Sequence, residues 1–299
     1  MNSFDYFQVL FFCCILILIT PILGLFLARV FQGKRTFMHA LLGWLERFIY
    51  NICGINEEEE MDWKGYIKAL LIFNAVGFIF LFILQIVQQW LPLNPTKLPN
   101  VRWDLAFNTA VSFFTNTNWQ AYGGESTMSY LTQMLGLTVQ NFLSAATGFA
   151  VFLALTRGII SKASDALGNF WVDVVRSIVY ILLPLSVILA ILLAGQGVIQ
   201  NFSHYKTAIT IQGVSQTLPM GPAASQIAIK QLGTNGGGFF GTNSSHPYEN
   251  PTPLSNLLEM LAILLLPAAL VYTYGVMVNN KKHGWLIFSV MFLDRKSVV

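Results

Sequence analysis

The sequence contains few charged residues. Asp, Glu, Lys and Arg make up 10% of its 299 residues, whereas a soluble domain carries about 25%. So few charges cannot coat a water-soluble globule of this size. With 55% hydrophobic residues and a mean hydropathy of +0.59, the composition excludes a soluble enzyme and indicates an integral membrane protein. The net charge of +3 is small and gives no argument for a nucleic-acid partner.

Cysteine is also scarce. Of the three in the chain, Cys13 and Cys14 are neighbours inside an apolar run and Cys53 stands alone. This spacing matches neither a disulfide framework nor a metal-binding motif, so we expect the cysteines to be structural. His204 and His246 stand apart from other potential metal ligands. No nucleophile lies at a sensible spacing from a base, so no catalytic residue is predicted.

Long apolar runs, in contrast, are abundant. Five are long enough to cross a bilayer, which takes about 20 mostly apolar residues. They cover roughly 6–31, 67–92, 130–156, 171–195 and 255–278. The first has no basic residue before it and is longer than a signal peptide, so we expect it to be retained. A sixth run begins at Gly284 and offers only about ten apolar residues before Asp294, too few to cross, which indicates a truncated chain.

The basic residues predict the orientation of these runs. All but four of the 17 fall near the amino-terminal helix and in the loops after the first, third and fifth runs. Because basic loops stay in the cytoplasm, we expect the amino terminus to be extracytoplasmic. The four exceptions are Lys97, Arg102, Lys206 and Lys230. The acidic run at 57–60 is interpreted as a solvated loop face, with a partner contact as the alternative.

The two segments predicted to lie outside the cytoplasm share an order of features. Each starts with a short apolar stretch of helical spacing, at 103–114 and 221–232, and then breaks into a string rich in Thr, Asn and Gly. This order is typical of a re-entrant pore loop between two membrane helices. Polar residues follow the first break at Thr138, Gln140, Asn141 and Ser144, where they either line a vestibule or bond to neighbouring helices.

The matching order predicts the domain organisation. Residues 67–156 and 171–278 are interpreted as two repeats of one membrane-pore-membrane unit, as in transport folds that are built from repeats. Residues 1–66 form an amino-terminal transmembrane helix and a cytoplasmic loop. Residues 284–299 are the truncated start of a third repeat.

Both breaks are candidate cation sites. Non-helical backbone at membrane depth persists only where it is buried in protein or lines a water-filled cavity, and potassium is held by backbone carbonyls that replace its water shell. Gly236, Gly237 and Gly238 tolerate the backbone angles that this requires. Neither string has a carboxylate in its interior, which argues against a divalent cation. A packing turn or capped loop is the structural alternative, and a phosphate loop is disfavoured because Gly-Lys-Ser/Thr is missing.

Several long strings in the chain match a known family. They are FFTNTNWQAYGGE, LTVQNFLSAATGFAV, LPMGPAASQ, LGTNGGGFF and NSSHPYENPTPLSN. These strings closely resemble the potassium-translocating A subunits (KdpA) of bacterial Kdp potassium-transporting P-type ATPases. The resemblance runs from the amino terminus to about residue 280 and covers only the amino-terminal part of a family member.

The resemblance implies a fold and a site. The fold is an all-α integral membrane protein of the potassium channel and transporter superfamily, with two of four membrane-pore-membrane repeats present. One filter strand would comprise Asn116, Thr117, Asn118 and Gln120, and the other Thr234, Asn235, Gly236 and Gly237. Backbone carbonyls are expected to contact the ion, while Gln120 and the Asn side chains brace the filter.

The resemblance also implies a function. The A subunit selects potassium, the only ion expected to bind here, at an extracytoplasmic filter and passes it to the B subunit, a P-type ATPase. Small C and F subunits complete a complex in the lipid bilayer of the bacterial inner (plasma) membrane. The chain itself is expected to be non-hydrolytic, without an ATP site. The alternatives are a passive potassium channel or symporter of the same fold, an inactive truncated fragment, or a membrane-embedded enzyme.

Overall fold

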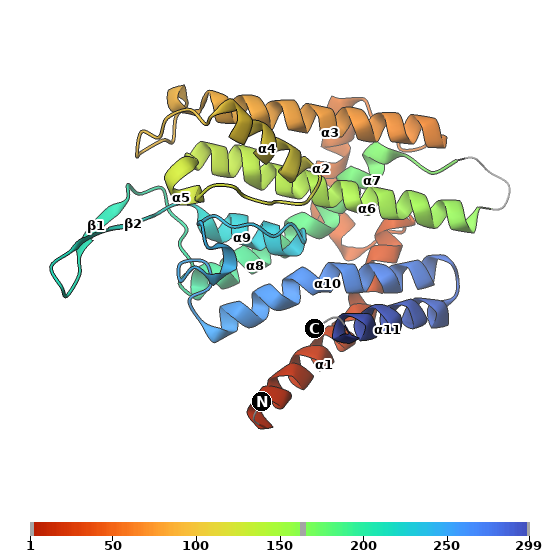
Figure 1. The fold of residues 1–299 in the computed structure, drawn as a ribbon. Helices are drawn as coiled ribbons and strands as arrows, with labels where there is room; N and C mark the ends of the chain where they lie inside the picture. Colours follow the sequence, from red (N-terminus) through yellow and green to blue (C-terminus); the bar gives the residue numbers. More distant parts are fainter. Residues whose placement is uncertain (1–2, 162–165, 298–299) are drawn as a thin grey trace. The chain divides into compact units, whose positions relative to one another are not determined.

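The computed structural model describes residues 3–161 and 166–297, which form helices joined by loops and one two-stranded hairpin (Figure 1). The helices are α1 (Ser3–Phe31), α2 (Phe37–Cys53), α3 (Trp63–Ile86), α4 (Trp103–Phe114), α5 (Gly124–Thr127), α6 (Val139–Ile160), α7 (Phe170–Arg176), α8 (Leu183–Gly195), α9 (Ala223–Leu232), α10 (Pro253–Met277) and α11 (Lys281–Ser297). Two π-helical stretches, Thr132–Thr138 and Ser177–Leu182, lead into α6 and α8. Short 3₁₀ turns lie at Gln88–Trp90 and Asn243–Ser245.

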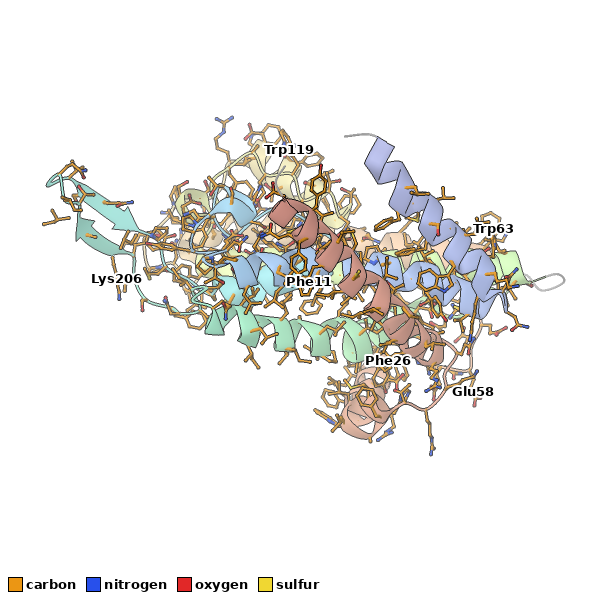
Figure 2. All side chains as sticks on the ribbon, turned by 90° about the horizontal axis from the view of Figure 1, so that it is seen from below. Phe11, Phe26, Glu58, Trp63, Trp119 and Lys206 are labelled. Carbon is orange, nitrogen blue, oxygen red and sulfur yellow. The ribbon has the colours of Figure 1, made fainter. Side chains whose placement is uncertain are left out.

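Among the described residues, five helical stretches are long and apolar enough to cross a membrane, and they confirm the five predicted runs. They are Asp5–Phe31, Trp63–Ile86, Thr132–Ile160, Phe170–Gly195 and Pro253–Met277. Exposed aromatic and aliphatic side chains along α1, Phe11 among them, project outward from the helix (Figure 2). Such a surface suits lipid contact. The second stretch ends at Ile86 instead of the predicted 92, because a 3₁₀ turn and then Pro92 interrupt the α-helical pattern.

Three elements differ from the sequence predictions. The predicted cytoplasmic loop within 1–66 contains α2, whose apolar face was not recognised in a segment too polar to span. The all-α prediction omitted the hairpin β1 (Lys206–Ile209) and β2 (Ser215–Leu218), antiparallel with Lys206 opposite Leu218. Helix α11 begins before Gly284 and continues past the apolar run. Within that predicted 284–299 segment, 298–299 lie outside the described residues, as does Lys162 of the orientation argument.

The chain divides into two compact units. The first comprises Met1–Leu70, Ala146–Leu183 and Met260–Val299, and the second comprises Leu71–Ala145 and Pro184–Glu259. The core of the first includes Leu16 of α1, Ala268 of α10 and Phe288 of α11. The core of the second is built around α4. In Figure 1 the hairpin of the second unit extends away from α5 and α9, and Lys206 marks its start in Figure 2.

A buried carboxylate ties α2 to the end of α7 in the first unit. Glu46 accepts hydrogen bonds from Arg176 Nε at 2.9 Å, from Tyr50 Oη at 2.9 Å and from the Tyr180 hydroxyl. Burial raises the pKa of Glu46, but the hydrogen bonds from Tyr180, Arg176 and Tyr50 outweigh it. The pKa therefore lies below the ordinary value of 4.5.

This depressed pKa predicts an acid-sensitive contribution to stability. The contribution is present above about pH 4.5 and is lost as the pH falls through the lower pKa of the folded state. Glu46→Gln removes one partner of a buried pair and is expected to lower the free energy of unfolding at pH 7 by about 3–5 kcal/mol. Thermal unfolding of the purified chain in lipid nanodiscs at pH 7 and pH 3.5 measures this, and the difference from wild type should shrink at the lower pH.

The matched control is Glu58→Gln, at an exposed acidic residue of the same unit (Figure 2). It should leave the midpoint of unfolding unchanged at both pH values, since exposed charges contribute little. Equal destabilisation by both substitutions would contradict the role assigned to Glu46.

Candidate functional site

Two short helices of the second unit end in irregular segments. Helix α4 spans Trp103–Phe114, which is the predicted 103–114 stretch. Helix α9 begins at Ala223, two residues after the predicted start, because Pro222 is its N-cap. Each buries an apolar face, with Ala106, Ala110 and Phe113 on α4 and Ala224, Ile227 and Ala228 on α9. The carboxyl ends of both helices, where the helix dipole is negative, lead directly into the Thr- and Asn-rich segments.

The two segments share an unusual backbone conformation at corresponding positions. One residue beyond each helix cap, Asn116 (φ 61°) and Thr234 (φ 56°) take left-handed conformations, and two residues further Asn118 (φ 51°) and Gly236 (φ 73°) do so again. Three of these four are not glycine. Non-glycine residues rarely adopt positive φ, so surrounding contacts must hold the backbone in place.

In these segments, backbone N–H groups donate hydrogen bonds, but most of the carbonyls accept none. The N–H groups of Thr117 and Asn118 both donate to the carbonyl of Ser112 at 3.0 Å, and that of Asn235 donates to Lys230 O at 3.0 Å. Within the described part of the chain, six carbonyls accept no hydrogen bond, three successive ones in each segment: those of Asn116, Thr117 and Asn118 and those of Thr234, Asn235 and Gly236. Unpaired carbonyl oxygens in such segments are the ligands that a weakly hydrated cation requires.

Side chains lock the two segments together. Asn235 Nδ2 donates to Asn116 Oδ1. The Gln120 amide bonds to Gly238 twice, donating to its carbonyl at 3.0 Å and accepting from its N–H at 2.8 Å. The Gly241 N–H donates to Glu125 Oε2 at 2.7 Å. These partners are 119, 118 and 116 residues apart, so the segments run side by side in the same direction.

Residues from the stretch that follows the first segment complete this bracing. Asn118 Nδ2 donates to Asn141 Oδ1. Ser144 Oγ donates to Asn116 Oδ1 at 2.9 Å and accepts from Asn235 Nδ2 at 3.0 Å. The side chains of Asn141 and Ser144 therefore bond to neighbouring elements, which was one of the two predicted roles, and they hold both segments.

A pocket of about 470 Å³ lies along the two segments. Its walls come from Thr117, Asn118, Trp119, Gln120, Gly237, Gly241 and Asn243. None of these side chains is charged, and the Trp119 side chain is exposed (Figure 2). A neutral, amide- and carbonyl-rich pocket suits a monovalent cation better than a phosphate or a divalent ion.

All eight predicted filter residues lie in these two segments, but they differ in what they offer. Gln120 uses its side chain to hold Gly238. The carbonyl of Gly237 accepts a hydrogen bond from Lys230 Nζ at 3.0 Å and is therefore already occupied. The other six present the unpaired carbonyls.

Two residues of the site, Lys230 and Glu249, were not predicted from the sequence. Lys230 was taken as one of the outside basic residues, yet its side chain is 1% exposed and pairs with Glu249, whose side chain is 0% exposed. The signal was present, because Lys230 is the one charged residue in the stretch 221–232, where a buried charge needs a partner. Glu249 is 19 residues away and could not be chosen as that partner from spacing.

Known proteins match nearly the whole chain. The family of potassium-transporting ATPase A subunits (KdpA) matches residues 10–296. Relatives named potassium-transporting ATPase potassium-binding subunit include that of Pseudomonas syringae pv. tomato, 56% identical over 97% of this chain and 52% of its own length. Those of Geobacter sulfurreducens and Sorangium cellulosum are 52% and 57% identical, over 98% and 94% of this chain and 54% and 50% of their own lengths.

The chain spans about half the length of the curated relatives it matches. The match covers both irregular segments, the last four candidate membrane spans in full and the first span from residue 10 onward. The chain belongs to the family of potassium-transporting ATPase A subunits.

Proposed function

We propose that the chain binds and selects potassium as part of an ATP-driven, high-affinity potassium importer, at a filter built from the two irregular segments. The observation that carries this proposal is the set of six unpaired carbonyls at 116–118 and 234–236. The names of the relatives support it, since each is called a potassium-binding subunit.

Potassium is the cation that fits this ligand set. It is large and weakly hydrated, so neutral carbonyls replace its water shell at a small cost, whereas a divalent ion needs carboxylates. The negative ends of α4 and α9 add to the attraction without adding a fixed charge. Selection would then depend on the number and spacing of carbonyls, which the bonds from Asn235 and Gln120 maintain.

The repeated geometry favours two membrane-pore-membrane units, 67–156 and 171–278. Helices α4 and α9, the positive φ values after their caps and the interlocked partners all recur at an offset of about 116 to 120 residues. A chain with two such units matches about half of each relative, which fits relatives with four. The segment 284–299 would then begin the third.

The membrane setting and partners follow from the family. We place the chain in the inner membrane of a bacterium on the basis of the family. We place its amino terminus outside the cytoplasm, because basic residues cluster on the opposite side. The potassium selected at the filter passes to a P-type ATPase B subunit, which hydrolyses ATP, while C and F subunits complete the complex. The chain itself carries no catalytic residue in this scheme.

The proposal predicts potassium binding and ATP-dependent uptake. Purified chain in lipid nanodiscs should gain thermal stability with potassium and gain none with equal sodium, because a bound ion stabilises the folded state. In the native host, with other potassium uptake routes deleted, uptake at micromolar potassium should stop when the gene is removed.

Deleting the partner ATPase separates the alternatives. An importer loses uptake, whereas a passive channel or symporter of the same fold keeps it. Equal stabilisation by potassium and sodium, together with unchanged uptake after removal of the gene, would overturn the proposal.

A further inference from the structure

A buried lysine reaches the second segment from the last turn of α9. Lys230 lies in α9 with a side chain that is 1% exposed, and its Nζ donates to the carbonyl of Gly237 at 3.0 Å. A lysine is almost never fully buried unless it is paired. Its ammonium group therefore has a specific task at this position, next to a segment that presents carbonyls to a cation.

The partner of this lysine holds the same segment further along. Glu249 Oε2 accepts from Lys230 Nζ, and Glu249 Oε1 accepts from the backbone N–H of Phe240 at 2.8 Å. The pair thus spans Gly237 to Phe240, with the lysine on a carbonyl at one end and the glutamate on an N–H at the other. Between them, Gln120 holds Gly238 and Gln133 Nε2 donates to Phe239 O at 3.0 Å.

We propose that Lys230 and Glu249 are positioning residues of the filter: Lys230 turns the Gly237 carbonyl away from the ion and so ends the ligand set at Gly236, and Glu249 cancels the charge of Lys230. The proposal rests on the proposed potassium function. Lys230 would then act through geometry, and Glu249 through charge.

The position of the Gly237 carbonyl affects selectivity. A carbonyl that accepts a hydrogen bond from an ammonium group is not free for the transported ion. The second segment therefore offers the ion only the carbonyls of Thr234, Asn235 and Gly236. Without the lysine, the Gly237 carbonyl regains freedom, and Gly237, with φ of 67°, can rotate at little cost. A looser strand discriminates less between potassium and sodium.

The charge of Lys230 affects the affinity for potassium. An uncompensated ammonium group beside a cation site repels the ion strongly, because a protein interior screens charges poorly. Glu249 removes this repulsion while its other oxygen holds Phe240. A purely structural ion pair would hold the loop as well, but it would not make ion affinity depend on the sign of the remaining charge.

The experiment is a double-mutant cycle in the native host, with uptake kinetics for potassium and inhibition of uptake by sodium as readouts. The variants are Glu249→Gln, Lys230→Met and the double variant. Glu249→Gln keeps an oxygen for the Phe240 N–H but leaves the lysine charge, and should raise the KM for potassium at least tenfold. The double variant, which lacks both charges, should return to within threefold of wild type in KM.

Selectivity should follow a different pattern in the same cycle. Both variants that lack Lys230 should lose at least fivefold in preference for potassium over sodium, since neither holds the Gly237 carbonyl. Glu249→Gln, which keeps the lysine, should change this preference less. A double variant with a KM as high as that of Glu249→Gln, or a preference unchanged by Lys230→Met, would overturn the proposal.

Two controls keep the test decisive. Asp104→Asn removes an exposed ion pair with Arg102 in the same unit and should leave both readouts unchanged. If Glu249→Gln fails to accumulate in the membrane, Lys230→Arg and Lys230→Met decide: the arginine should retain the preference for potassium and the methionine should lose it, and equal behaviour overturns the proposal. Failure of the potassium function itself would appear separately, as potassium uptake that is unchanged when the gene is removed.

Discussion

Replacing Gly238 with alanine is expected to reduce the kcat/KM of potassium uptake by about 100-fold, which corresponds to about 3 kcal/mol of overpacking. A Cβ at this position would lie 2.5 Å from Asn243 Cα and 2.8 Å from Glu249 Oε1. The first is a backbone atom and cannot rotate away. Both backbone groups of Gly238 are also held by Gln120, so the segment cannot move without breaking the lock between the two strands.

Gly236→Ala is the matched control for this prediction. A Cβ at Gly236 meets no atom within 4 Å, so the substitution introduces only the strain of φ at 73°. That strain costs about 1 kcal/mol, and we expect an effect of about fivefold on the KM for potassium. Uptake kinetics in the native host, normalised to the amount of chain in the membrane, compare the two. Equal effects of the two alanines would mean that strain, and not the clash at Asn243, dominates.

The membrane helices could be predicted because their physics is local. A run of about 20 apolar residues has few alternatives to a spanning helix, and the five predicted runs agree with the structure to within a few residues at most ends. The predicted short helix at 103–114 coincides with α4, because its apolar residues recur at helical spacing. The hairpin was missed because strands of four residues with exposed side chains carry no apolar alternation.

The site could be predicted only in part. The resemblance placed the eight residues of the expected filter in two segments, and these segments do lie side by side. Sequence could not supply the contacts that hold them, because Gln120 and Gly238 are 118 residues apart and meet only after the unit packs. The burial of Lys230 was missed for a related reason, since an exposed lysine and a lysine buried against a glutamate can have the same local sequence. Burial and partner choice are properties of the packed unit.

Asn235→Leu is expected to raise the KM for potassium by about 30-fold. The Asn235 amide donates to Asn116 Oδ1, to Ser144 Oγ at 3.0 Å and to Asn141 O at 3.3 Å. Leucine has nearly the same shape but donates none of these bonds. The amide has two N–H hydrogens, so these three contacts amount to two full bonds. At about 1 kcal/mol for each bond, the loss is about 2 kcal/mol of support for the first segment and its unpaired carbonyls.

Ser144→Ala is a milder variant for comparison. It removes the hydroxyl that accepts a hydrogen bond from Asn235 and leaves the hydrogen bond between Asn235 and Asn116. We expect a rise of about fivefold in KM, in line with about 1 kcal/mol. Potassium-dependent thermal stabilisation of the purified chain should decline in the same order, wild type above Ser144→Ala above Asn235→Leu. If Asn235→Leu lowered thermal stability without potassium but left the KM unchanged, Asn235 would serve folding and not the ion site. The hydrogen bonds from Asn235 join the two segments beside the unpaired carbonyls. We therefore expect the affinity for potassium to fall when these bonds are lost.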